Sequence, residues 1–390
     1  MNHIKSKSPC CECKNCIHIC PTHAIELKYN SFGTSYPIVN EKICINCGKC
    51  VKSCVVVNDI EKHTPLLTYA CLSKSEEEAN SSSGGVFFEL AKYVIKKKGV
   101  VIGVAFADNL SVEYIEVSTI EELYRIQGSK YVKGNVNTVF QRVKNRLMND
   151  KFVLFSGTPC HVAALKLYLQ ELSNCRNLLT VDLICHGTPP YSLFSNYIKH
   201  LEKKTSKKVV DYKFRDKTYK YGITGKICFL EKKGISEKRY FKKENSYYSL
   251  FLKGYINCDY CYQCKFAETR RVGDITLGDF WGAGEEIPGF FIKNNINFGK
   301  DISAVIINTE DGANIFKSIK NKLLKKEIKL ESVSKYNNSL NRPTPLNQAE
   351  RSKIETIYKE KGYNGIEKYF KRMVGIKRFS HRIRLILRKL

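Results

Sequence analysis

Two runs of evenly spaced cysteines lie near the start of the chain. Each run has three cysteines separated by two residues and a fourth after three more residues. Bacterial [4Fe–4S] sites use this spacing, because the first three thiolates fold around one cluster while the fourth reaches the neighbouring cluster. The spacing therefore predicts two [4Fe–4S] clusters that transfer electrons singly. The predicted ligands are Cys10, Cys13, Cys16, Cys20, Cys44, Cys47, Cys50 and Cys54.

The fourth cysteine of each run is expected to cross to the other cluster. One ligand set is Cys10, Cys13, Cys16 and Cys54, and the other is Cys44, Cys47, Cys50 and Cys20. Cys11 falls outside the spacing, and we interpret it as a bystander. Residues 1–62 are thus predicted to form a bacterial-type two-cluster ferredoxin domain.

Zinc and disulfides are the other uses of such cysteines. Tetrahedral zinc needs two cysteine pairs brought together from a distance, whereas each run here has three evenly spaced cysteines and a fourth. The segment from Met1 to Pro9 is polar and lacks the apolar core of a secretory signal. Dense cysteines without such a signal favour metal or redox use over disulfides. We expect a cytoplasmic protein, with peripheral membrane association as an additional possibility.

The chain is too long for a ferredoxin alone. A two-cluster ferredoxin needs about sixty residues, so most of the 390 residues belong to one large or two moderate further domains. Hydrophobic residues make up 43% of the sequence, which is ordinary for a globular protein. No apolar run approaches the roughly 18 residues of a membrane-spanning helix.

The chain is strongly basic. It has 65 Lys and Arg against 38 Asp and Glu, a formal net charge of +27. The basic residues are spread along the chain, without the stripe and interleaved aromatic residues of a nucleic-acid module, so no nucleic acid is expected as a partner. Positive charge suits the docking of an acidic redox partner such as a small ferredoxin, because complementary fields steer association.

Strands and helices alternate after the cysteine runs. Strands are expected at 152–156 and 178–185, each followed by a tight turn and a helix, at 161–172 and 191–204. Such alternation predicts parallel strands whose turns lie together at their carboxyl ends. The fold class is therefore α+β or α/β, with a β-rich part beyond Val209. The expected domains after residue 62 are an αβ domain at 63–145, a larger domain at 146–325 and a helical basic tail at 326–390.

A third cysteine triplet has the same spacing but no fourth cysteine nearby. It consists of Cys258, Cys261 and Cys264, and it predicts a third [4Fe–4S] cluster. Cys160 and Cys185 each follow a predicted strand and could complete the set, and Cys185 is preferred. A degenerate or zinc-filled site, or three cysteines in a loop, is the alternative. The remaining cysteines, Cys71, Cys175 and Cys228, are expected in the core.

A strand-like segment follows the third triplet, with Asp274 and Asp279 at its ends and glycines that allow close backbone approach. Together with the triplet, this segment resembles the family of the beta subunit of coenzyme F420-reducing hydrogenases and dehydrogenases, which includes flavin–iron-sulfur reductases. The resemblance runs from Cys10 to about Asn308. It rests on the motifs Ser82–Gly85, Gly128–Val132, Ser156–Cys160, Cys185–Gly187, the third triplet and Gly273–Gly282.

The resemblance implies a flavin, FAD or FMN, beside the third cluster. The backbone of Ser83–Gly85 at a helix start could bind phosphate, Lys130 could neutralise it and Tyr131 could stack on the ring. A plain helix cap and a surface lysine are the alternatives for the first two. His186 is a candidate catalytic proton donor, although a histidine beside a turn is often structural. The candidate flavin residues are Ser82, Ser83, Gly84, Gly85, Ser129, Lys130, Tyr131, Thr158, Asp274 and Asp279.

These features predict an iron–sulfur flavoprotein oxidoreductase. It would relay electrons between a ferredoxin-like or deazaflavin partner and a small organic substrate, because a flavin joins one-electron to two-electron chemistry. The alternative is an electron-transfer adaptor subunit without a substrate of its own. Apolar and basic residues alternate at helical spacing in the last fifteen positions, which suits contact with a membrane surface or a partner, or packing on the protein itself. The apolar positions are Ile376, Phe379, Ile383, Ile386 and Leu390.

Overall fold

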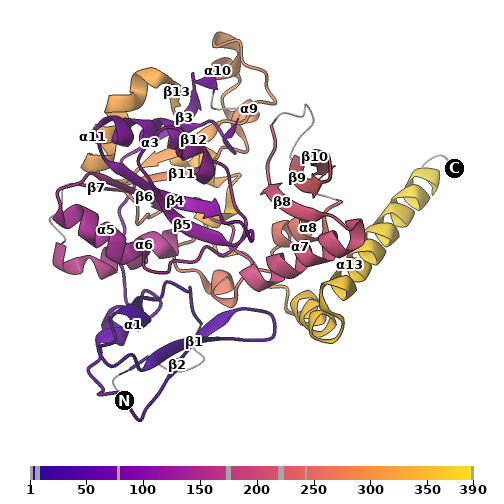
Figure 1. The fold of residues 1–390 in the computed structure, drawn as a ribbon. Helices are drawn as coiled ribbons and strands as arrows, with labels where there is room; N and C mark the ends of the chain where they lie inside the picture. The colour runs from indigo at the N-terminus through magenta and orange to yellow at the C-terminus, as the bar shows by residue number, and fades with distance from the viewer. Residues whose placement is uncertain are drawn as a thin grey trace.

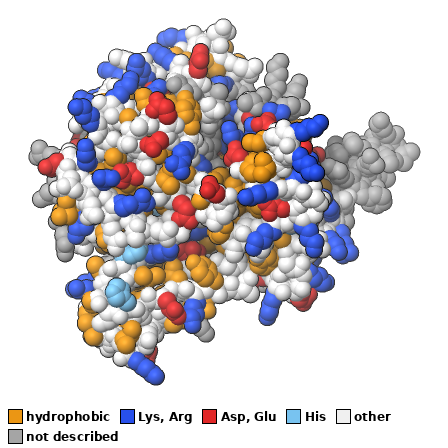
Figure 2. All heavy atoms as spheres, viewed as in Figure 1, with side chains coloured by type: hydrophobic (Ala, Val, Ile, Leu, Met, Phe, Trp, Pro, Cys, Tyr) orange, Lys and Arg blue, Asp and Glu red, His pale blue; other side chains and the backbone are white. Residues whose placement is uncertain are grey.

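The structure is a computed structural model that describes residues 3–4, 9–76, 80–172, 177–217, 224–241 and 244–387. An N-terminal cysteine module lies beneath a large domain built on one sheet, and a smaller unit carries a long C-terminal helix at the right of Figure 1. The mixed α/β class predicted from the sequence is confirmed. Lys and Arg side chains are scattered over the visible face of the molecule rather than gathered in one stripe (Figure 2).

The N-terminal module repeats one local structure. Its elements are α1 (Asn15–His18), β1 (Ile25–Tyr29), β2 (Ser35–Val39) and α2 (Lys49–Lys52). Each one-turn helix carries the third cysteine of a run, Cys16 in α1 and Cys50 in α2. The residue before each helix is left-handed, with φ of 61° at Lys14 and 74° at Gly48. The two cysteine runs therefore fold alike.

The large domain contains a mixed sheet of eight strands. Their order is β13-β3-β12-β11-β7-β6-β4-β5. The four central strands β4, β6, β7 and β11 are parallel, and the outer strands pair antiparallel. The predicted parallel pairing of the strands before Cys160 and Cys185 is thus confirmed. The strands are β3 (Leu67–Ser73), β4 (Val100–Phe106), β5 (Val112–Val117), β6 (Val153–Gly157), β7 (Leu178–Leu183), β11 (Ile275–Asp279), β12 (Ser303–Ile307) and β13 (Leu323–Glu327).

Helices cover both faces of this sheet. One face packs on α3 (Val86–Lys96) and α11 (Glu310–Ile319), and the other on α5 (Val139–Met148) and α6 (Pro159–Tyr168). Successive residues of β6 alternate between the two layers, because strand side chains point to opposite faces. Helix α6 begins at Pro159, two residues earlier than predicted, since Thr158 is extended and a proline is favourable in the first helical turn.

The smaller unit is built around aromatic side chains. Strands β8 (Lys208–Lys213), β9 (Thr224–Glu231) and β10 (Gly234–Phe241) form an antiparallel sheet. It shares one core with α7 (Tyr191–Thr205), α8 (Ser246–Leu252) and α13 (Gln348–Leu387). Tyr212 and Tyr247 both pack on the ring of Phe194, at centroid distances of 5.2 and 5.0 Å. The tyrosine-rich segments therefore form part of the hydrophobic core of this unit.

Short elements complete the fold. They are α4 (Leu123–Ile126), η2 (Gln170–Leu172), η3 (Asp259–Gln263), α9 (Ala283–Glu286), α10 (Pro288–Lys293), η4 (Lys320–Lys322), α12 (Leu330–Ser334) and η5 (Asn338–Leu340). Within the described residues, no helix is both long and apolar enough to cross a membrane. The side chains at 376–390, which carry the predicted amphipathic face, lie outside the described residues.

Two of the three cysteines expected in the core are found there. Cys71 lies in β3 and Cys228 in β9, and both are buried. Cys175 lies outside the described residues. Cys71 and Cys228 therefore pack as small hydrophobic side chains, away from the other cysteine groups.

A buried ion pair fixes the segment that follows the third cysteine triplet. Arg271 and Asp182 are both 2% exposed or less, and their side chains lie 3.3 Å apart. Arg271 also donates to the carbonyls of Phe266 and Glu268, at 2.9 and 3.0 Å. The pair therefore ties the end of the cysteine loop to strand β7.

Replacing Asp182 with alanine would leave the guanidinium of Arg271 buried without its carboxylate. We expect the free energy of unfolding to fall by about 3–5 kcal/mol, as for other broken buried pairs. Anaerobic urea unfolding followed by circular dichroism measures it. Glu286→Ala, which removes an exposed pair with Lys335, is the matched control and should barely move the midpoint. Equal shifts in the two variants would contradict the role given to the buried pair.

Candidate iron–sulfur sites

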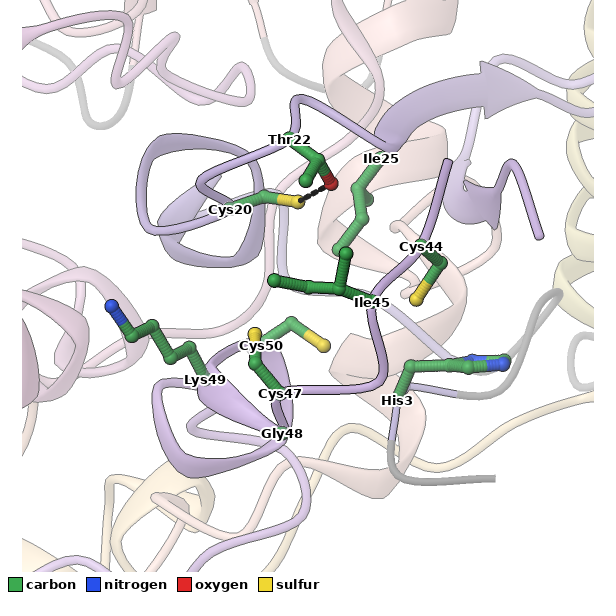
Figure 3. A pocket seen from close by; sticks show the side chains of 10 residues that line it. All are labelled: His3, Cys20, Thr22, Ile25, Cys44, Ile45, Cys47, Gly48, Lys49 and Cys50. Carbon is green, nitrogen blue, oxygen red and sulfur yellow. Dashed lines mark hydrogen bonds between the residues drawn. The ribbon is translucent and has the colours of Figure 1, made fainter. Parts of the chain in front are cut away.

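Four cysteines of the N-terminal module line one hollow. Cys20 comes from the segment after α1, and Cys44, Cys47 and Cys50 come from the turn around α2 (Figure 3). The N–H of Ala24 donates to Cys20 Sγ at 3.3 Å, and the Thr22 hydroxyl lies 3.7 Å from it. Burial alone would raise the pKa of Cys20, but these two contacts lower it. Four thiols around one space form the donor set that a [4Fe–4S] cluster requires.

The other predicted set lies deeper in the module. Cys13 and Cys16 are buried, and Cys10 and Cys54 are partly exposed. The pKa of Cys16 is raised mainly by burial and then by the charges of Cys10 and Cys54. These electrostatic influences indicate that Cys54, from the second run, lies close to cysteines of the first run. The crossed ligand assignment requires Cys54 to lie close to the first run, and the assignment itself stays a prediction.

A second hollow lies where the module meets the carboxyl ends of the parallel strands. The third triplet, both candidates for the fourth ligand and two residues of the N-terminal module contribute thiols to its wall. These thiols belong to Cys258, Cys261, Cys264, Cys160, Cys185, Cys10 and Cys11. Among the described residues no group of three or more His, Cys, Asp or Glu side chains has the geometry of a single-ion metal site.

Turns at the strand ends deliver the thiols to this hollow. Cys160 lies in the first turn of α6, and its Sγ is 3.3 Å from the hydroxyl of Thr158. Gly187 has a φ of +107°, and a Cβ there would lie 2.4 Å from the amide nitrogen of the Asn257 side chain. Only glycine adopts this positive φ readily and also leaves room for the side chain of Asn257. The turn after Cys185 can therefore pack directly against the start of the third triplet.

Both candidates for the fourth ligand reach the hollow. After burial, Cys261 is the largest influence that raises the pKa of Cys185. The pKa of Cys160 is raised above all by a hydrogen bond with Cys11. Cys185 therefore lies close to the triplet, while Cys160 lies close to both Cys11 and the triplet, since it is also the largest influence after burial that raises the pKa of Cys264. Cys185 remains our preferred fourth ligand.

Two residues of the hollow, and one that contacts its wall, were not recognised as functional from the sequence. Cys11, interpreted as a bystander, is buried and lies in the wall beside Cys160. Glu12 accepts a hydrogen bond from the thiol of Cys258 at 3.8 Å, and burial raises the pKa of its carboxyl. Lys133 also lines the hollow and is 6% exposed. One indication in the sequence that Lys133 could be functional is its position two residues after the flavin candidate Tyr131.

His186 lies in the wall of the same hollow. Its Nε2 is buried without a hydrogen-bond partner among the described residues, and its ring contacts Phe251 edge-on at a centroid distance of 5.5 Å. Burial lowers the pKa of His186, which favours the neutral imidazole. The predicted role as a proton donor remains a prediction.

The candidate flavin segments meet one another at the carboxyl edge of the sheet. The N–H of Ser129 donates to Ser82 Oγ at 2.7 Å, and the N–H of Gly84 donates to Ser303 Oγ at 2.8 Å. The Ser83 hydroxyl donates to the Ile302 carbonyl at 3.2 Å. The loop before α3, which ends at Gly85 with a φ of 80°, is therefore held by neighbouring protein groups.

Lys130 and Tyr131 have protein partners as well. The ammonium of Lys130 donates to three backbone carbonyls near the end of α4, at 2.8 to 3.3 Å. The ring of Tyr131 stacks on Phe251 with centroids 4.8 Å apart. These contacts occupy the groups expected to bind phosphate and to stack on a flavin, so the two residues fit that expectation only in part.

The two aspartates lie at opposite ends of β11. Asp279 is at the carboxyl end and pairs with Arg215 at 2.6 Å, and burial raises the pKa of its carboxyl. Asp274 precedes the strand and accepts hydrogen bonds from the backbone and hydroxyl of Thr180, at 2.7 and 2.6 Å. Asp274 is thus separated from the other flavin candidates, and Thr158 lies in the thiol-lined hollow instead.

Known proteins are similar to this chain over stretches of different length. The ferredoxin-type protein NapF of Haemophilus influenzae is 36% identical over 56 residues, 13% of this chain and 32% of the relative. The chain thus matches about a third of that protein's length. A structure of the F420-reducing [NiFe] hydrogenase complex from Methanosarcina barkeri is 15% identical, with a TM-score of 0.48 over 76% of this chain and 93% of that chain.

A family model gives the match that bears on the large domain. It describes the C-terminal part of the beta subunit of coenzyme F420 hydrogenase/dehydrogenase, and it matches residues 150–335. This range includes the turn at Cys160, the turn at Cys185, the third triplet and the strand that ends at Asp279. The resemblance inferred from these motifs is confirmed over residues 150–335, which are similar to the C-terminal part of the coenzyme F420 hydrogenase/dehydrogenase beta subunit.

Proposed function

We propose that this protein is an iron–sulfur oxidoreductase that carries electrons between a redox partner protein and its large α/β domain. One observation carries the proposal. Three groups of cysteines, distant in sequence, form a series from the surface of the N-terminal module to the carboxyl edge of the sheet. The ferredoxin-type relative and the family match both support electron transfer as the role of this series.

The residues present fit iron–sulfur clusters. Cys20, Cys44, Cys47 and Cys50 would hold one, and Cys10, Cys13, Cys16 and Cys54 a second. Cys258, Cys261 and Cys264 would hold a third, with Cys185 as the fourth ligand. When bound, such clusters take up and release single electrons.

The order of the three cysteine sets can be inferred from where the outer and inner sets lie. Cys47, in the outer hollow, is exposed to solvent. Cys10 belongs to the middle set and also lines the inner hollow. The middle set therefore lies between the other two, and close contact between neighbouring sets is what single-electron transfer needs. We infer that electrons enter or leave the protein near Cys47.

Contacts between the module and the large domain keep this order fixed. Lys14 donates to the side chain of Asn135 at 2.6 Å, and Asn15 donates to the carbonyl of Ala164 at 2.8 Å. His18 Nε2 lies 2.7 Å from the carbonyl of Asn137. All three module residues lie in or beside α1. The helix that carries Cys16 is thereby held against the large domain.

The surface around Cys47 suits a protein partner. Ile43 and Ile45 flank Cys44 and are 46% and 63% exposed. Side chains of the hydrophobic class are spread over the module at the lower left of Figure 2. Exposed apolar side chains rimmed by charge are typical of protein contact sites. An acidic ferredoxin-like partner suits the net positive charge of the chain.

The substrate side of the proposal is the carboxyl edge of the sheet. The resemblance implies a flavin there, and a flavin exchanges two electrons with organic molecules or with a deazaflavin. Ser82–Gly85, Ser129 and Asp279 converge at this edge, which supports the location. Lys130 and Tyr131 are engaged with protein groups, so they add little support for a flavin. The flavin is proposed because of the family resemblance and because these neighbouring segments converge.

A cofactor inventory tests the proposal directly. Anaerobically purified protein should contain about 12 iron atoms and one flavin per chain, since each [4Fe–4S] cluster holds about four iron atoms. Cys44→Ala should lose about four of them, because Cys44 lines the outer hollow. Cys228→Ala, at a buried cysteine of β9, should lose none. Zinc in place of iron, or no iron loss in Cys44→Ala, would refute the iron–sulfur assignment.

The fourth ligand of the inner site is tested by a pair of variants. Cys185→Ala should remove about four iron atoms, because Cys185 is the proposed fourth ligand, while Cys160→Ala should retain them, because the thiol of Cys160 is engaged with that of Cys11. Iron analysis and electron paramagnetic resonance spectra of the reduced proteins measure this. Iron loss in Cys160→Ala alone would exchange the two roles.

The docking surface is tested at Ile45. Ile45→Glu replaces an exposed apolar side chain with a carboxylate that repels an acidic partner. We expect at least a tenfold lower second-order rate of reduction by a dithionite-reduced bacterial ferredoxin in stopped-flow measurements, with unchanged iron content. Ile235→Glu, at a residue of β10 that is 66% exposed, is the matched control. Equal rates in both variants would place the entry point elsewhere.

A further inference from the structure

Lys133 is a buried cation in the wall of the inner hollow. Its residue is 6% exposed, and its backbone N–H donates to the carbonyl of Pro189 at 2.8 Å. In the described part of the chain, no hydrogen bond or ion pair joins its ammonium to another side chain. A buried ammonium is costly unless anionic groups compensate it, so the presence of Lys133 in the wall favours an anion in the hollow.

The groups that surround Lys133 are thiols and one carboxyl. Lys133 shares the wall of the hollow with Cys11, Cys160 and Cys258. A lysine side chain is ordinarily charged at neutral pH, and an anionic centre in the hollow favours that form. Glu12, the one carboxyl in this group, accepts a hydrogen bond from the thiol of Cys258, and it is also close enough to Lys133 for their charges to interact.

Other buried or half-buried cations near the carboxyl edge of the sheet have protein partners. The ammonium of Lys130 is bound to three carbonyls. Arg215 pairs with Asp279 and with Asp301, at 2.6 and 3.0 Å. Arg271 pairs with Asp182. Lys133 differs from these three because it lines the thiol-lined hollow and, among the described residues, its ammonium makes no hydrogen bond or ion pair with a carbonyl or carboxylate.

We propose that Lys133 supplies the counter charge for an anionic thiolate-ligated centre in the inner hollow and thereby raises its reduction potential. The inference rests on the proposed iron–sulfur function. Reduction transfers one electron from the redox partner to this centre, which gains one negative charge without any bond of the protein being made or broken. A fixed positive charge nearby favours the more negative form, and it acts strongly because the site excludes water.

Replacing Lys133 with methionine keeps most of the side-chain volume and removes the charge. We expect the one-electron reduction equilibrium of the inner centre to become at least tenfold less favourable, a fall of about 59 mV in midpoint potential. Lys133→Arg should keep the potential near that of the wild type. Lys97→Met, at an exposed lysine after α3, removes the same charge at a distance and should have no effect. Redox titrations followed by electron paramagnetic resonance measure all four proteins.

The outcomes separate this inference from the proposed function. An inner centre present in wild type with an unchanged potential in Lys133→Met overturns the role of Lys133 alone. If the wild type holds only the two outer clusters, the inference fails together with the inner part of the proposed function. Loss of about four iron atoms in Lys133→Met, with full iron in Lys133→Arg, supports a counter charge that the centre needs for binding. The same loss in both variants overturns it, because charge would then not be the property required.

Discussion

The cysteine loop from Asn257 to Arg271 depends on two buried arginines, one at each end. This loop has only a short 3₁₀ segment, so its conformation comes from its surroundings. At one end Arg351 of α13 donates to the carbonyl of Asn257 at 2.9 Å and pairs with Asp259 at 2.9 Å. At the other end Arg271 joins the loop to Asp182. A guanidinium can satisfy several carbonyls and a carboxylate at once, which allows a loop without regular structure to be buried.

The sequence predicted those features that depend on local spacing. The parallel strands before Cys160 and Cys185 were predictable because tight turns link each strand to a helix, and a right-handed crossover then places neighbouring strands parallel. The hollow formed by Cys20 and the cysteines around Cys47 was foreseeable for a similar reason, since the crossing of the fourth cysteine is a property of the pattern itself. In the first case the deciding residues lie within a few positions of one another, and in the second they lie in two short cysteine runs with the same spacing.

The features that escaped prediction depend on contacts between distant segments. Lys133 and Lys130 are three positions apart and of the same type, yet one faces the thiol-lined hollow while the other binds backbone carbonyls of its own turn. The direction of each side chain is set by tertiary packing. Asp274 and Asp279 likewise looked equivalent at the ends of one strand, but the ends of β11 lie at opposite edges of the sheet. Cys11 is in the inner hollow only because the module is placed against α6.

The placement of the module is therefore what completes the inner hollow. Its wall combines Cys10 and Cys11 of the module, the strand-end cysteines of the large domain and the loop that Arg351 holds. Arg351 also lies over the ring of Phe32, 3.9 Å from its centroid, so the same guanidinium contacts the module and the loop. A shift of the module would move Cys10 and Cys11 away from the proposed ligands, which all belong to the large domain. The wall of the inner hollow thus depends on the assembled chain, and the properties of the site should be sensitive to contacts such as Phe32 with Arg351 that lie outside the ligand set.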